Sequence, residues 1–189
     1  MPTGASVRDA RALGIVRRAT NGTVNTGVTA AEYGDGVNHV SVLTVKQIDS
    51  HTIADDAALA DGSLIYTFPA GVVVVDYSYM SMALTAASTA AQGDTPDVGL
   101  GVGEATGTVT GLSGTATFED IITGQQAANA SGTPTVITAL PTGGVPLIIA
   151  AGAARTVYFN IADTWADVTG DDLTVDSEGT IVLVWRFLA

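Results

Sequence analysis

The chain of 189 residues contains no cysteine, which excludes a disulfide framework, a thiolate zinc site and a cysteine nucleophile. Basic residues are scarce as well. Seven lysines and arginines stand against 19 aspartates and glutamates, so the net charge is −12, and Lys46 is the only lysine. This balance argues against direct binding to nucleic acid, because contact with the phosphate backbone depends on clustered basic side chains.

Long hydrophobic runs are also missing. The longest uncharged apolar stretch, residues 143–154, is interrupted by glycine and proline and is too short to span a bilayer, so we expect no membrane segment. The first 20 residues contain four arginines and Asp9, which break up the continuous apolar segment that an export signal needs. We therefore expect the protein to be made and to fold in a cytoplasm.

What the sequence does have is a series of strand-like segments rich in β-branched and aromatic residues, separated mostly by glycine, proline, aspartate or asparagine. In residues 155–161, Val157, Phe159 and Ile161 alternate with polar residues, which is typical of a half-buried strand. The last segment, 180–188, is apolar on both faces and predicts a central strand or one covered by a partner subunit. The predicted strands are 37–45, 63–68, 72–84, 133–140, 145–150, 155–161 and 180–188.

Many short strands with little amphipathic helix predict an all-β fold, an antiparallel β-sandwich of jelly-roll type. The best helix candidate is 118–130, where Phe118, Ile121 and Ile122 have helical spacing, although the segment could be a single helical turn in a loop. Residues 84–92 are ambiguous between helix and continued strand. Residues 20–36 are rich in Thr, Gly and Asn and predict extended arm or loop, so we place an N-terminal arm at 1–36 and the β-sandwich domain at 37–189.

Catalytic signals are weak. His39 and His51 are the only histidines, and we expect structural or surface roles for both. Carboxylates gather at 94–97 and at 166–179, where Asp171, Asp172 and Asp176 could contribute to a calcium site, but the spacing of a known calcium loop is absent. We expect no enzymatic activity, no cofactor and no bound transition metal.

The N-terminal arm has an unusual charge. Arg8, Arg11, Arg17 and Arg18 are opposed only by Asp9, so the first 18 residues carry about +3 and the remainder about −15. One interpretation is a frayed terminus or a helix packed on its own domain. We favour the other, a segment that orders on the acidic surface of a partner. In that interpretation the arginines bind carboxylates, and Leu13 and Ile15 add apolar contacts.

Three strings carry a resemblance to a known family: DTPDVGLGVGEATG (94–107), FEDIITGQQAANASGTPTV (118–136) and VYFNIADTWADVTGDDLTVDSEGTIVLVWRFLA (157–189). They resemble small structural proteins of tailed bacteriophages, marine phages in particular, that are regarded as capsid decoration or cement proteins. The likeness runs from about residue 55 to the C-terminus and does not include the first 36 residues. It contains no catalytic motif.

The resemblance implies a virion structural protein on the exterior of the capsid, synthesised in the host cytoplasm. Its partner would be the major capsid protein of a tailed phage, and it would stabilise the assembled head against internal DNA pressure. Proteins of this kind commonly assemble as homotrimers, so a homo-oligomer, and specifically a trimer, is expected.

Two functions of other classes remain as alternatives. A carbohydrate- or receptor-binding β-sandwich of a phage fibre or adhesin would need an exposed aromatic platform, for which Tyr77, Tyr79 or Trp165 could serve, or a calcium site. Packing within strands is the simpler interpretation of these aromatic residues. A small hydrolase would need clustered histidines or paired carboxylates in a cleft.

Overall fold

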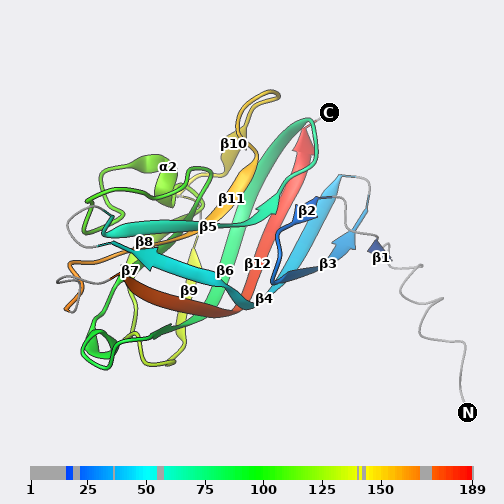
Figure 1. Cartoon of the computed structure of the whole chain (residues 1–189). Coiled ribbons are helices and arrows are strands. Elements are labelled where there is room, and N and C mark those ends of the chain that lie inside the picture. Colours follow the sequence, from blue (N-terminus) through cyan, green and yellow to red (C-terminus); the bar gives the residue numbers. More distant parts are fainter. Residues whose placement is uncertain are drawn as a thin grey trace, which may run out of the picture.

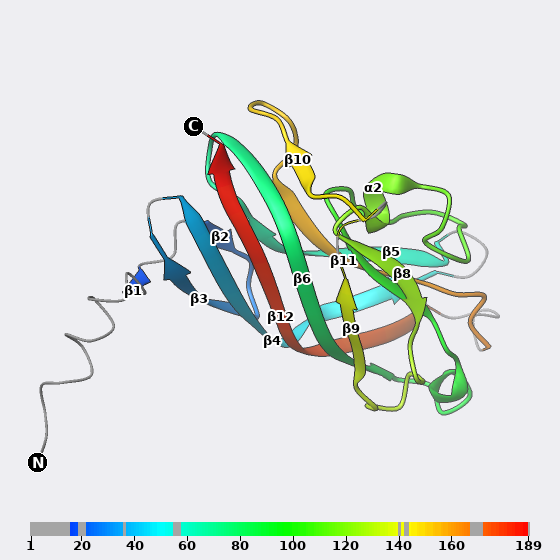
Figure 2. The same ribbon diagram turned by 180° about the vertical axis from the view of Figure 1, so that it is seen from behind.

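The computed structural model describes residues 16–18, 22–35, 37–54, 58–139, 141, 144–166 and 172–188. Within these ranges the chain is almost entirely β-strand, arranged as two antiparallel sheets (Figures 1 and 2). The predicted all-β sandwich is therefore confirmed. The strands are β1 (Val16–Arg18), β2 (Thr23–Val24), β3 (Val28–Gly34), β4 (Asn38–Ile53), β5 (Ala60–Thr67), β6 (Val72–Ala86), β7 (Asp97–Gly101), β8 (Ile122–Gln126), β9 (Thr135–Ala139), β10 (Leu147–Ile149), β11 (Thr156–Ala162) and β12 (Leu173–Leu188).

The larger sheet has the order β1-β3-β4-β12-β6-β10, and β9 also pairs with β6. The C-terminal strand β12 lies between β4 and β6, as its two apolar faces predicted. Its register shifts between Val175 and Ser177 and again between Ser177 and Gly179. Such irregularities bend a strand, and Figure 1 shows β12 curving along its length.

The smaller sheet has the order β2-β5-β11-β7-β8. Strand β11 is central in it, and Val157, Phe159 and Ile161 point into the core as their alternation predicted. From the larger sheet, Leu183 and Trp185 of β12 are buried as expected, whereas Phe187 is half-buried at the margin of the core. The core thus consists of the facing apolar sides of the two sheets.

Residues 22–34 differ from the expected arm or loop. Strand β3 pairs with β4 along its whole length, with Val28 opposite Val45 and Gly34 opposite His39, and β2 pairs with β5. Pairing with a neighbouring strand satisfies the backbone groups of a segment whose own side chains show little strand pattern. The folded region therefore begins well before residue 37.

The helix expected at 118–130 is confined to one turn, α2 (Ala116–Glu119), and the chain then forms β8 beside β7. The ambiguous 84–92 segment continues β6 as far as Ala86, and a 3-10 turn, η1 (Ala91–Gly93), follows. Among the described residues, no helix has the length and hydrophobicity needed to cross a membrane.

Candidate interaction surface

Two of the six expected arm residues lie in the described part of the chain. Arg17 and Arg18 belong to β1, where their backbones pair with Tyr33 and Glu32 of β3. Strand β1 is the first strand of the larger sheet. The other four, Arg8, Arg11, Leu13 and Ile15, lie outside the described residues.

The side of the larger sheet that faces away from the core is a broad surface with little charge. Three rows of residues in register cross it, and none of their side chains is buried. We call this set the outer face. Its rows are Tyr33–Val40–Val184–Tyr77, Ala31–Val42–Val182–Tyr79 and Thr29–Thr44–Thr180–Ser81–Val136.

The outer face exposes three large apolar side chains. Tyr33 and Tyr77 are 37% and 38% exposed, and Val136 is 60% exposed. Between these residues lies a half-buried stripe that consists of Val40 and Val42 of β4 and Val182 and Val184 of β12. Contiguous exposed apolar surface commonly marks a site of protein–protein contact.

The smaller sheet has no comparable exposed side, because other segments of the chain cover the side that faces away from the core. Asn160 of β11 is fully buried there. It accepts a hydrogen bond from the amide of Ala105 at 2.9 Å and donates to the carbonyl oxygens of Gly103 and Phe118 at 3.0 and 2.8 Å. A small apolar cluster around Leu112 packs beside it. The loop before α2, and α2 itself, thus close this side.

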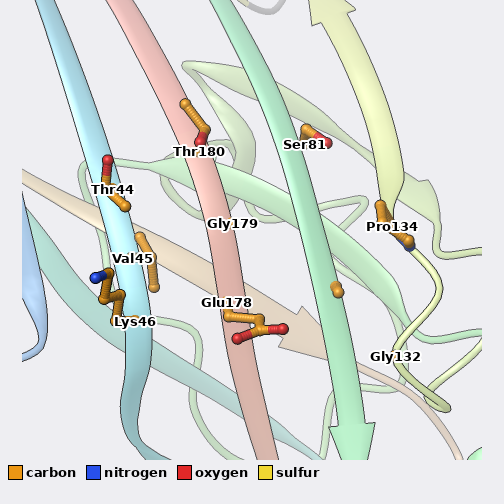
Figure 3. Close-up of a pocket in the computed structure, with 10 residues that line it drawn as sticks. Thr44, Val45, Lys46, Ser81, Gly132, Pro134, Glu178, Gly179 and Thr180 are labelled. Atoms are coloured by element: carbon orange, nitrogen blue, oxygen red, sulfur yellow. The ribbon is translucent and has the colours of Figure 1, made fainter.

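A hollow of about 410 Å³ lies at one end of the outer face, where β12 is irregular. Figure 3 shows Thr44, Thr180 and Ser81 side by side on β4, β12 and β6. Lys46 and Glu178 add charges of opposite sign, and Gly132 and Pro134 form the margin beside β9. The lining offers hydroxyl groups and backbone rather than a set of catalytic side chains.

Beneath the outer face, a buried polar network joins the two sheets. Glu32 of β3 is completely buried, and its Oε1 accepts hydrogen bonds from the amide of Gly22 at 3.3 Å, the Ser41 hydroxyl at 3.4 Å and the Tyr66 hydroxyl. Trp185 in turn donates from Nε1 to Ser41 Oγ at 2.8 Å. Burial and the hydrogen bond to Glu32 raise the pKa of the Tyr66 phenol above its usual range. The network holds the N-terminal strands against the core.

Several carboxylates lie around the smaller sheet. Burial and the nearby Glu119 raise the pKa of Asp97, and burial with the charge of Asp94 raises that of Asp163. Both residues line a polar hollow of about 340 Å³. Burial raises the pKa of Asp120 to about 6. Within the part of the chain that the structure describes, no three His, Cys, Asp or Glu side chains form a group able to hold a metal ion.

The 166–179 segment, considered above for a calcium site, is not a single loop. Residues 173–179 belong to β12, so Asp176 lies within a strand beside Thr85 of β6. Asp172 directly precedes this strand, and Asp171 lies outside the described residues. The sugar-stacking alternative also loses Trp165, which is buried and donates from Nε1 to the carbonyl oxygen of Leu59 at 3.0 Å.

Both histidines are buried. The ring of His39 stacks on Trp185, with centroids 4.1 Å apart. His51 Nδ1 lies 2.9 Å from Asp61 Oδ2, which links β4 to β5 of the opposite sheet. These contacts give the histidines structural roles, as expected.

Comparisons with known proteins add little. No protein family and no curated protein matches the sequence. Among solved structures, the chain is similar to one in the "Cyanophage Pam1 capsid asymmetric unit", with a TM-score of 0.37, 17% identity and 100% of each chain covered. A TM-score this low does not establish a common fold, and this identity does not establish a common function.

The outer face was only partly visible in the sequence. The second apolar side of the last strand, which carries Val182 and Val184, predicted either a central strand or a strand covered by a partner subunit. The structure shows a central strand, and this side is part of the outer face. The contribution of β3, with Tyr33, was missed because its segment was expected to be a loop. The alternation of Val40 and Val42 with buried residues of β4 was the signal that could have identified the face.

Proposed function

We propose that this protein decorates the capsid of a tailed phage, where it binds the major capsid protein of the assembled head as a homo-oligomer, expected to be a trimer. Such a protein needs a stable β domain and binding surfaces rather than catalytic groups. The sequence resemblance of residues 94–107, 118–136 and 157–189 supports this role. So do an outer face without charged residues and the basic residues near the N-terminus of the sequence.

The observation that carries the proposal is the position of β1. This strand, with Arg17 and Arg18, lies at the edge of the larger sheet and directly follows the arm in the sequence. We expect the arm, with Arg8, Arg11, Leu13 and Ile15, to bind a neighbouring subunit. Several copies in one oligomer would bind the shell together, because later contacts form at a high effective concentration.

The test measures binding of the purified protein to expanded, empty capsids of its phage. Removing residues 1–15 leaves β1 in place, so the domain should stay folded while loading onto capsids falls sharply. The double variant Arg8→Gln/Arg11→Gln should also load poorly, and its loading should depend less on salt than that of the intact chain. Arg155→Gln, directly before β11 of the smaller sheet, removes a positive charge from the domain and serves as the control. Full loading by the truncated protein would show that the arm is not the binding element.

A further inference from the structure

The outer face of the larger sheet has no covering element among the described residues, although the smaller sheet is closed by its own chain. Of the eight exposed large apolar side chains in the described part of the protein, Tyr33, Tyr77 and Val136 lie on this face. Exposed tyrosine and valine on a flat sheet are costly in water and prone to association. A partner that removes this surface from water is therefore favoured.

Charge on the outer face indicates what that partner is. No charged residue occurs in its three rows, in a protein whose net charge is −12. At one end of the face, Arg186 forms an ion pair with Asp76 at 3.0 Å. At the other end, Lys46 and Glu178 carry opposite charges. Two copies can thus meet through the three rows without bringing carboxylates together, whereas the net negative charge of the rest of the chain makes other contacts between copies repulsive.

The shape of the face fits a second copy equally well. Sheets that pack face to face keep their strand directions within about 30° because their twists match. A second copy brings a sheet of the same twist. Five strands spaced by about 4.8 Å, over the four residue steps of about 3.3 Å from Val184 to Thr180, cover roughly 300 Å². Two such faces in contact bury roughly 600 Å², which is the size of a small interface that forms as the protein concentration rises.

We propose that a second copy of this chain covers the outer face, so that the uncharged rows of β3, β4, β12, β6 and β9 form the contact between subunits. This assigns a surface to the association of the protein with itself and does not depend on capsid binding. One outer face packed on another relates two copies by a two-fold axis, and the measured mass shows how many copies assemble.

The experiment compares oligomeric mass in solution by sedimentation equilibrium over a range of protein concentrations. The wild-type protein should exceed the 19.0 kDa of one chain. Tyr77→Glu and Val136→Glu each place a carboxylate on the face of every copy. They should raise the dissociation constant at least about tenfold, because each adds repulsion twice in a symmetric contact. Both replaced side chains are already exposed, so the circular dichroism spectrum should not change.

The matched control is Val24→Glu on β2 of the smaller sheet, a valine that is 37% exposed. It adds the same charge away from the outer face and should leave the mass of the assembly unchanged. A wild-type protein of 19.0 kDa at every concentration overturns the proposal, and so does wild-type mass for both face variants. If the wild type is monomeric and Tyr77→Glu abolishes capsid loading, the face binds the capsid protein instead. That result refutes the second-copy proposal and the expected homo-oligomer, but not the proposed binding to the capsid.

Discussion

The hydroxyl of Tyr66 on β5 donates a hydrogen bond to the carboxylate of Glu32 on β3, and both side chains are completely buried. The contact joins the smaller sheet to the larger one across the core. It also fixes the N-terminal part of the fold, because the same carboxylate oxygen accepts a hydrogen bond from the amide of Gly22. The start of the folded region is thus held by a polar group rather than by apolar packing alone.

Tyr66→Phe should lower the free energy of unfolding by about 1–3 kcal/mol, because it removes a donor from a buried carboxylate. In a double-mutant cycle with Glu32→Gln, we expect a coupling of about 0.5–3 kcal/mol, measured by urea denaturation. Tyr33→Phe removes a hydroxyl from an exposed tyrosine of β3 and should change stability by less than about 0.5 kcal/mol. Equal effects of the two Tyr→Phe changes would contradict a structural role for the network.

Asp120 predicts how stability depends on pH. Burial raises its pKa in the folded protein to about 6, above the ordinary value of 3.8. The folded state therefore takes up a proton at a higher pH than the unfolded state, and stability should rise as the pH falls from 7 to 5. The raised pKa values of Asp97 and Asp163 act in the same direction.

In Asp120→Asn this pH dependence should weaken, because the side chain no longer titrates. The amide oxygen can still accept the hydrogen bond that the Val102 amide donates to Asp120 Oδ1 at 3.0 Å. Urea denaturation at pH 7 and pH 5 measures the difference for both proteins. An unchanged pH dependence in the variant would show that Asp120 is not the responsible group.

The two phenylalanines at the C-terminal end of the fold should differ in their effect on stability. Phe159 of β11 is completely buried, so Phe159→Ala should cost about 3–5 kcal/mol through the cavity that it leaves. Phe187 of β12 is half-buried, and Phe187→Ala should cost less, because water can reach the vacated space. Thermal unfolding of both variants gives the comparison, and a larger loss at Phe187 would contradict the described core.

Gly179 permits the irregular segment of β12. Its φ is 151°, and an added Cβ would lie 2.1 Å from the carbonyl oxygen of Ser81 on β6. Gly179→Ala should therefore strain the backbone, separate β12 from β6 and lower the melting temperature strongly. At Gly93 an added Cβ meets nothing within 4 Å, so Gly93→Ala should be tolerated. Similar melting temperatures for the two variants would show that the close approach at Gly179 is not needed.

Local pattern in the sequence determined most of the strands. Alternation in 155–161 identified the inward residues Val157, Phe159 and Ile161, because neighbouring side chains of a strand point to opposite faces. The two apolar sides of 180–188 likewise indicated a central strand. The acidic domain and its basic terminus followed from the positions of the charged residues along the chain, which do not depend on how the chain folds.

The tertiary structure decided which weakly patterned segments join the sheets. Strand β3 carries Ala31 and Glu32 rather than a run of β-branched residues, and it forms because β4 pairs with its backbone and Tyr66 binds its carboxylate. Strand β8 replaces most of the helix expected at 118–130, because an available neighbour, β7, outweighs a short helical spacing. The outer face was decided in the same way. Its rows combine residues from five strands, most of them distant in the sequence, and only the pairing register places them side by side.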